Sequence, residues 1–322
     1  MCHARLAIDI GGTFTDVVLE LTDNSRVTTK LLTTCEHPGD AVLAGITDVM
    51  QRADINAADV GLIIHGTTLA TNALIQRSGA TTALLTTAGH RDVLEMAHED
   101  RFEQYDINIE RPAPLVPRYL RLPIRERMNR RGDTLIPLDE ESVASVLPVL
   151  EEHEVESVAI GYLHAFVNPA HEQRTAELLQ AARPDLSITL ASEVCPEIRE
   201  FERLSTACAN AYVRPPIARY LQRLAGELTE RGFGCPFLLM TSGGGLTTLD
   251  TATRFPIRLV ESGPAGGAIL ARQVARELKL NRLLSFDMGG TTAKLCLIDD
   301  FEPLTSRSFE VDRVYRFKKG SG

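Results

Sequence analysis

The sequence lacks the features typical of secreted proteins, of small zinc-binding proteins and of membrane proteins. Only 6 of its 322 residues are cysteine, and no two of them have C-x-x-C or zinc-ligand spacing. No apolar run reaches the roughly 18 residues that a membrane span needs, and the opening MCHARLAIDIGG has no signal-peptide pattern. We therefore expect a reduced, soluble, cytoplasmic protein without membrane contacts.

Positive charge is also scarce. The formal net charge is −9, and acidic and basic residues are interspersed. Without a basic stripe to neutralise phosphates, nucleic-acid binding is not expected. The Arg-rich stretch 117–133 is a local exception, which we interpret as a solvated loop or edge strand rather than an acid-binding surface.

Strand and helix patterns alternate along much of the chain. Buried strands are predicted at 4–10, 13–21, 60–66, 81–87 and 158–164, with helical patterns at 40–52, 67–79, 139–153 and 264–278. This alternation predicts an α/β fold with a largely parallel sheet. Residues 98–137 contain five prolines and little periodicity, which indicates a functional excursion or a subdomain. The pair Pro215-Pro216 predicts a break between two helices, 197–213 and 216–231.

One unusual turn occurs twice. Residues 6–21 read LAIDIGGTFTDVVLEL and residues 283–300 read LLSFDMGGTTAKLCLIDD, so Asp-x-Gly-Gly-Thr stands between two apolar strands in both places. A single copy is more often an ordinary β-hairpin turn than a binding site. Two copies with Asp and Thr at matching positions favour a nucleotide site, in which both turns hold one phosphate chain.

Each residue type in the turn has a chemical reason. Glycines leave no Cβ and allow backbone N–H groups to close on a phosphate, and threonine hydroxyls can bind the same oxygens. The candidate phosphate ligands are Gly11, Gly12, Thr13, Thr15, Gly289, Gly290, Thr291 and Thr292. An aspartate repels phosphate but can hold Mg²⁺ or orient a water. We therefore expect Asp9 and Asp287 to face a single metal ion.

The two turns resemble the phosphate-1 and phosphate-2 loops of the actin-like ATPase (ribonuclease H-like) superfamily, which also contains sugar kinases and heat-shock chaperones. The stretch ESGPAGGAILARQVAREL, 261–278, is similar to the hinge helix that precedes phosphate-2 in that fold. The resemblance implies ATP and Mg²⁺ as cofactors. It also makes Glu261 a candidate catalytic residue that couples nucleotide to hinge closure, with a helix-start carboxylate favoured by the helix dipole as the alternative.

Six blocks in order narrow the resemblance to the hydantoinase A / 5-oxoprolinase family. They are IDIGGTFTDVV, HGTTLATNALI, TTAGHRDVLEM, the segment from ERPAPLVPRYL to LDEESV, ESGPAGG and FDMGGTTAK. The family implies an ATP-dependent hydrolase that opens a cyclic amide such as hydantoin or 5-oxoproline, after phosphorylation of the carbonyl oxygen.

Three other functions stay open. Relatives in the same family carboxylate ketones, and the nucleotide turns do not separate the two reactions. A non-catalytic actin-like nucleotide-binding protein is an alternative of another class, and a sugar-kinase-like phosphotransferase is a further one.

The chain is shorter than expected for this family, whose members are roughly twice as long. The resemblance implies an N-terminal hydantoinase A domain at 1–190 and a partial hydantoinase/oxoprolinase domain at 197–322, incomplete at its C-terminal end. Because the adenosine loop of the family lies beyond the second turn, we expect catalysis to need a missing C-terminal part or a B-type subunit.

Four further residues belong to family blocks and are candidates for the substrate cleft: His65, Thr67, Thr68 and Arg91. Thr67 and Thr68 start a predicted helix, whose N-terminus suits an anion, but they can equally be helix caps. Lys294 follows the second turn, where its cation could reach phosphate or could remain a solvated strand residue.

Overall fold

The computed structural model describes residues 4–34, 37–288, 293–311, 313–315, 318 and 321. The chain forms two compact units, each assembled from two separate segments. The first unit contains residues 1–72 and 217–309, and the second contains residues 73–216 and 310–322. The domains at 1–190 and 197–322 are predicted from resemblance to a family and not from compactness. They stay a prediction.

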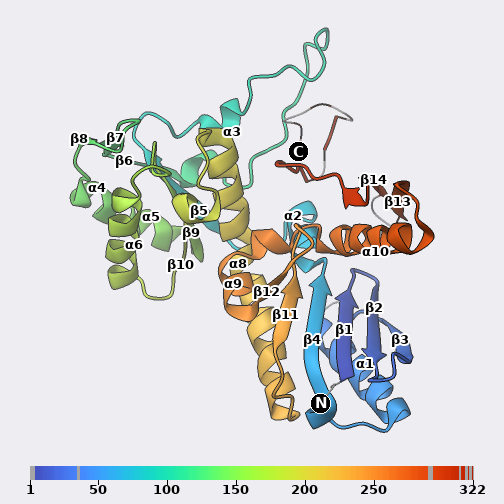
Figure 1. Ribbon diagram of the computed structural model, residues 1–322. Coiled ribbons are helices and arrows are strands. Elements are labelled where there is room, and N and C mark those ends of the chain that lie inside the picture. The colour runs from blue at the N-terminus through green and yellow to red at the C-terminus, as the bar shows by residue number, and fades with distance from the viewer. Residues whose placement is uncertain are drawn as a thin grey trace. The chain divides into compact units, whose positions relative to one another are not determined.

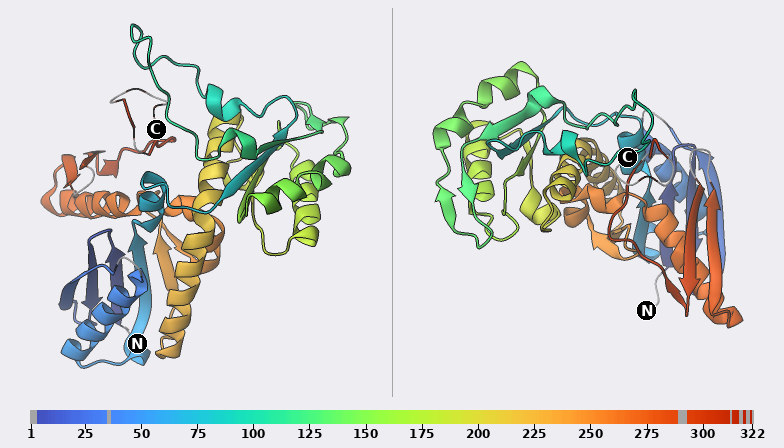
Figure 2. Two further views of the ribbon diagram at one scale, coloured as in Figure 1. Left: turned by 180° about the vertical axis from the view of Figure 1, so that it is seen from behind. Right: turned by 90° about the horizontal axis from the view of Figure 1, so that it is seen from above.

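A six-stranded mixed sheet forms the centre of the first unit. Its strand order is β12-β11-β4-β1-β2-β3, and β4, β1, β2 and β3 lie side by side in Figures 1 and 2. The strands are β1 (Ala4–Ile10), β2 (Phe14–Glu20), β3 (Arg26–Leu32), β4 (Val60–Thr67), β11 (Phe237–Met240) and β12 (Leu246–Thr248). β4 runs parallel to β1 and β11, whereas the other neighbours are antiparallel.

Alternation in the sequence decides which face of this sheet is buried. Every second residue of β1, from Ala4 to Ile10, is buried, and the residues between them are exposed. The buried side chains form a core with α1 and the C-terminal part of α8 (Glu200–Glu230). The helices assigned to this unit are α1 (Pro38–Ala53), η1 (Ala57–Asp59), α9 (Leu249–Arg254), η3 (Pro256–Leu259) and α10 (Ser262–Leu278).

A second, small sheet in the same unit contains the repeat of the turn. It consists of β13 (Arg282–Met288), β14 (Ala293–Asp299) and β15 (Glu302–Pro303), all antiparallel, and α10 packs on it. The two strands predicted within 283–300 are therefore confirmed. Gly289, Gly290, Thr291 and Thr292, which are predicted to form the turn, lie outside the described residues.

The second unit is built on a four-stranded, wholly parallel sheet of order β10-β9-β5-β6. Its strands are β5 (Thr82–Thr87), β6 (Arg121–Ile124), β9 (Ser157–Gly161) and β10 (Ser187–Leu190), and β7 (Arg127–Met128) pairs separately with β8 (Thr134–Ile136). The predicted excursion at 98–137 is therefore only partly irregular, because β6 adds an edge strand to the sheet. An edge strand suits the Pro- and Arg-rich sequence, because it needs hydrogen bonds on one side only.

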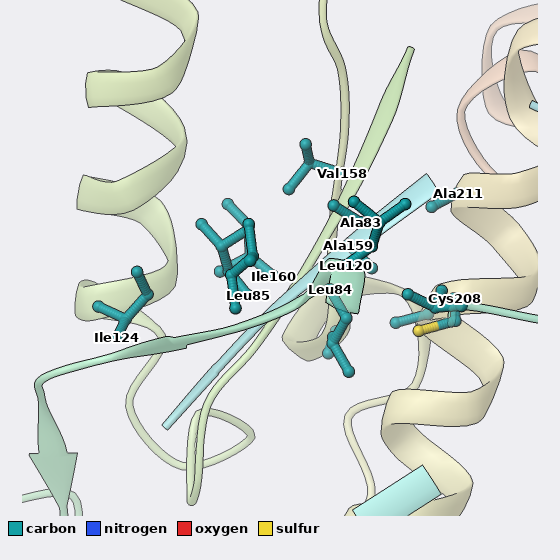
Figure 3. Close-up of a cluster of buried hydrophobic side chains, with 14 of the residues drawn as sticks. Ala83, Leu84, Leu85, Leu120, Ile124, Val158, Ala159, Ile160, Cys208 and Ala211 are labelled. Carbon is teal, nitrogen blue, oxygen red and sulfur yellow. The ribbon is translucent and has the colours of Figure 1, made fainter. Parts of the chain in front are cut away.

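Side chains of the central strands form the core of the second unit. In Figure 3 Leu85 and Ile160 lie to one side of the strands, and Leu84 lies on the side of the helix that carries Cys208 and Ala211. All of these side chains are buried. The helices are α3 (Val93–Met96), η2 (Arg118–Leu120), α4 (Glu140–Ala144), α5 (Leu147–Glu152), α6 (Ala170–Ala182) and α7 (Ala191–Val194), and the short α2 (Leu69–Ile75) spans the boundary between the units.

The predicted helix break at Pro215-Pro216 is wrong. α8 runs from Glu200 to Glu230 with both prolines inside it. Its N-terminal part packs into the core of the second unit, through Ala207 and Ala211, and its C-terminal part packs into the core of the first, through Leu224 and Leu228. Tertiary packing on both sides therefore outweighs the local cost of the prolines.

Across the described part of the chain, no helix combines the length and apolarity that a membrane crossing needs.

Candidate functional site

The first Gly-Gly turn is held in shape by β3. The Gly11 N–H donates to the Phe14 carbonyl at 2.9 Å, and the Thr33 hydroxyl donates to the Gly11 carbonyl at 2.9 Å. Thr33 also bonds through its backbone N–H to Thr13 and through its hydroxyl to Thr15, both at 2.9 Å. Thr15 is fully buried, so it supports the turn from below, whereas Gly12 and Thr13 are exposed.

The segment after β4 closes the other side of this turn. The Thr68 N–H donates to the Ile10 carbonyl at 3.0 Å, and the Asn72 amide donates to the Thr68 hydroxyl at 3.3 Å. A Cβ at position 12 would lie 3.1 Å from the Asn72 Nδ2 atom, so glycine allows this close approach. Thr67 is buried, and its Oγ1 accepts from the Leu69 N–H at 3.1 Å. Thr67 and Thr68 therefore stabilise the turn indirectly, through hydrogen bonds with residues next to it.

A row of residues crosses the sheet beside the turn. Strand pairing places Asp9 between Gly66 and Asp16, and Asp16 opposite Lys30. Lys30 Nζ bonds Asp16 Oδ2 at 2.8 Å. A Cβ at position 66 would lie 3.0 Å from Asp9 Oδ1, so glycine at 66 leaves room for the Asp9 carboxylate. Asp9 itself is exposed.

The surroundings of Asp9 disfavour its negative charge. Although solvent reaches the Asp9 residue, neighbouring atoms displace part of the water around its carboxylate, and this desolvation is the largest cause that raises its pKa. The like charges of Asp16 and then Asp287 add to it. Lys30 acts in the opposite direction. Like charges that lie directly opposite each other on neighbouring strands destabilise a sheet. A cation bound beside Asp9 would relieve this repulsion.

The start of α10 connects the two turn-bearing regions of the first unit. Lys294 forms an ion pair with the Glu261 carboxylate. The Glu261 N–H donates to the Thr71 hydroxyl at 3.3 Å, and the Ser262 hydroxyl donates to the Thr67 carbonyl at 3.2 Å. Lys294 also lies opposite Asp287 in the β13–β14 pair. Removal from water lowers the pKa of Lys294.

Glu261 has a backbone conformation that is rare for a residue with a side chain. As the N-cap of α10 it has a φ of 67°, in the left-handed region. Such strain persists only where surrounding contacts hold it, and it concentrates at functional sites. The contacts to Thr71 and Lys294 supply that support. In this structure the Lys294 ammonium group binds the Glu261 carboxylate.

Two of the candidate substrate residues have other partners within their own units. His65 is completely buried on β4, where its Nε2 atom bonds the Tyr220 hydroxyl at 3.0 Å and its ring stacks on Phe237. Burial lowers the pKa of His65 to about 3, so the ring is neutral. This placement gives no support to a substrate contact by His65. Arg91 belongs to the second unit, where it donates to the Arg118 carbonyl at 3.0 Å.

Sequence reasoning did not identify Asp16, Asn72 and Ser262 as parts of the site. Asp16 had a usable signal, because a hairpin turn at 11–13 places it directly across from Asp9. Asn72 and Ser262 act through contacts with residues far along the chain, which no local pattern reveals.

The carboxylates also allow a test of metal binding. Within the described residues, no three His, Cys, Asp or Glu side chains gather closely enough to hold a metal ion. Mg²⁺ commonly binds through one or two carboxylates together with water and phosphate. Asp9, whose pKa is raised in part by the charge of Asp287, forms with it a pair of carboxylates that is compatible with that kind of site.

The fold and the turn define a mixed α/β protein with a candidate phosphate-binding turn beside a strand-end aspartate. Comparison with known proteins is more specific. The chain belongs to the hydantoinase/oxoprolinase family: the family's N-terminal region matches residues 5–182, and the hydantoinase/oxoprolinase region matches residues 203–318.

Three curated relatives show the range of the family. The chain is 35% identical over 326 residues to an uncharacterized protein of Methanocaldococcus jannaschii, covering 99% of this chain and 47% of the relative. It is 35% identical to caprolactamase subunit alpha of Pseudomonas jessenii (91% and 43% covered) and 30% identical to the acetophenone carboxylase gamma subunit of Aromatoleum aromaticum (90% and 42%). The chain thus spans about half the length of these relatives.

Two solved structures have the same fold. The ATP-dependent caprolactamase from Pseudomonas jessenii matches with a TM-score of 0.82 at 34% identity, covering 91% of this chain and 43% of that one. A nucleotide-free acetone carboxylase matches with a TM-score of 0.84 at 24% identity, covering 94% and 45%, which shows the fold alone.

Proposed function

We propose that this chain is the nucleotide-binding part of an ATP-dependent enzyme that opens a cyclic amide. The observation that carries the proposal is the row Gly66–Asp9–Asp16 beside the turn at 11–13. It combines exposed turn residues, suited to phosphate, with a carboxylate whose repulsion by its neighbours a bound cation would relieve. The ATP-dependent caprolactamase, which is 34% identical to this chain, supports the choice of an amide.

The chain's own residues have distinct proposed roles. The Gly12 backbone N–H and the Thr13 hydroxyl would hold phosphate oxygens, whereas Gly11, whose N–H already bonds the Phe14 carbonyl, would shape the turn together with Thr15 and Thr68. Gly289, Gly290, Thr291 and Thr292 are proposed as the opposing turn. Bound ATP would supply the phosphoryl group that makes an amide carbonyl reactive, with Mg²⁺ neutralising charge. We assign Mg²⁺ to Asp9 and Asp287, and an actin-like ATPase architecture to the two turn-bearing regions.

Glu261 and Lys294 are proposed to couple the two regions. Their ion pair links the N-cap of α10 to β14, and the Glu261 backbone bonds Thr71 next to the first turn. A shift of the first turn can therefore reach the second through a short chain of contacts. In this role Glu261 is a positioning residue.

We also propose that activity requires further polypeptide. β13 and β14 expose five large apolar side chains on one face: Leu284, Phe286, Met288, Leu295 and Leu297, each at least 45% exposed. Strands that carry such a face are normally covered by another layer. The relatives named caprolactamase subunit alpha and acetophenone carboxylase gamma subunit support a companion subunit.

A ketone carboxylase is the second candidate function, because one curated relative is the acetophenone carboxylase gamma subunit. The deciding experiment measures ADP release by the enzyme assembled with its companion polypeptide, supplied in turn with 5-oxoproline, hydantoin, caprolactam and acetophenone plus bicarbonate. A ring-opened product together with substrate-dependent ADP would support the proposal. A carboxylated ketone would identify the second candidate, and nucleotide binding without substrate-dependent hydrolysis would show a non-catalytic protein.

A further inference from the structure

The parallel sheet of the second unit has a topological switch point. From β5 the chain passes to β6 on one side, and from β9 it passes to β10 on the other side. β5 and β9 are parallel neighbours, so their carboxyl ends lie together. In open α/β sheets, ligands bind outside the carboxyl ends of the strands at this kind of point.

The polar side chains at this edge form a fixed chain of hydrogen bonds. Thr87, at the end of β5, accepts from the Leu163 N–H at 3.0 Å and donates to Glu126, which follows β6. The second oxygen of Glu126 bonds His171 Nδ1 at 2.8 Å. The Glu126 side chain is wholly buried, and that of His171 is 12% exposed.

This series of hydrogen bonds decides which ring nitrogen of His171 remains available for a ligand. An ionised carboxylate only accepts hydrogen bonds, so His171 Nδ1 carries the proton that it donates to Glu126. In the neutral ring the Nε2 atom is then an acceptor, oriented by a buried partner. Because both oxygens of Glu126 are occupied, Glu126 positions His171 and is not itself free for a ligand.

A donor stands at the same edge. The Arg127 guanidinium donates to His90 Nε2 at 2.9 Å, and His90 lies in the loop after β5. Within the described ranges no carboxylate forms an ion pair with Arg127. Glu126 and Glu200 nevertheless lie near enough to act on the charge of His90. Glu200 also pairs with Arg203 at 4.0 Å, so two guanidinium groups stand against two carboxylates. The edge therefore has no excess positive charge, which favours a neutral ligand over an anion.

The adjoining residue His164 is strained. It has a φ of 63°, and its Nδ1 atom is buried without a hydrogen-bond partner. Left-handed backbone in a residue with a side chain costs energy and concentrates at ligand sites, and a buried unpaired nitrogen is costly as well. Both features lie directly after β9, at the switch point.

We propose that the segments after β5, β6 and β9, with Arg127 at the start of β7 and His171 at the start of α6, form a binding site for a neutral amide group. Arg127 donates to the carbonyl oxygen of the amide, and His171 accepts from its N–H. A lactam presents both groups on one edge, so the site suits the substrate class of the proposed function, on which this choice of ligand rests. The site lies wholly within the second unit and needs no nucleotide.

Binding of small probes to the full chain tests this proposal. Histidine is labelled with ¹³C, and the Cε1–H signals of the eight histidines are followed during titration with 2-pyrrolidinone, N-methyl-2-pyrrolidinone and acetate. We expect saturable shifts of His90, His164 and His171 with 2-pyrrolidinone, while His37 and His153 stay unchanged. N-methylation removes the N–H and should weaken binding at least tenfold. Acetate binding as tight as that of 2-pyrrolidinone would overturn the neutral-amide assignment.

Two substitutions separate the site from general effects. Arg127→Gln should weaken 2-pyrrolidinone binding at least tenfold, whereas Arg130→Gln, the same charge change at an exposed position three residues away, should not. Unchanged spectra elsewhere would show that Arg127→Gln is folded. Unaltered binding by Arg127→Gln, or shifts spread over all histidines, would refute the site. ADP release can persist in either case, so the proposed function is judged separately.

Discussion

Replacement of Gly66 by alanine tests whether room for the Asp9 carboxylate is the reason for glycine on β4. The added Cβ would lie 3.0 Å from Asp9 Oδ1 and 3.7 Å from its Cγ. That contact is too close, but Asp9 is exposed and its carboxylate can rotate away. We therefore expect the fold to tolerate the change and the Asp9 carboxylate to be displaced.

The magnitudes differ for stability and activity. Glycine-to-alanine in a compatible backbone stabilises by about 0.4–1 kcal/mol, which offsets the contact, so the free energy of unfolding should change by less than about 1 kcal/mol. A displacement of about 1 Å at a reacting centre can cost about 100-fold in rate. We expect ATP hydrolysis by the assembled enzyme to fall 10- to 100-fold, an order-of-magnitude figure from the same principle.

The matched control is Gly226→Ala on α8. No heavy atom lies within 4 Å of a Cβ built there, so this change should stabilise by about 0.5–1 kcal/mol without altering hydrolysis. Urea unfolding and ADP release measured on both variants complete the comparison. Wild-type hydrolysis by Gly66→Ala would refute the reasoning, and a loss of several kcal/mol would show that Gly66 serves packing instead.

Three further outcomes are expected. Asp287→Asn in the assembled enzyme should cut ATP hydrolysis by orders of magnitude with unfolding unchanged, and near-normal turnover would contradict the metal assignment. Because burial lowers the pKa of His65 to about 3, protons bind mainly to the unfolded state between pH 6.5 and 3. Stability should therefore fall with decreasing pH in that window, by at most about 1.4 kcal/mol per pH unit from this group, and His65→Phe should flatten the urea-midpoint profile. Gly161→Ala would place a Cβ 2.0 Å from Leu204 Cδ2 and should destabilise by about 1–3 kcal/mol; an unchanged urea midpoint would show that Leu204 moves freely.

Local sequence was sufficient where neighbouring residues alone determine the structure. The strands on either side of both Asp-x-Gly-Gly-Thr copies, the helix that starts at 262 and the position of Asp9 at the end of β1 all follow from alternation and glycine chemistry. Family membership followed from the order of six short blocks and is confirmed by the matched regions.

Contacts between distant segments decided the rest. Thr15 is buried where it bonds Thr33, which follows β3, and His65 is buried where α8 brings Tyr220 against it. α8 continues through two prolines because both of its halves pack into cores. By itself, the sequence identified the residues that we propose to bind phosphate. The tertiary structure alone decided which of them support the turn and which face solvent, because burial and pairing depend on strands and helices far along the chain.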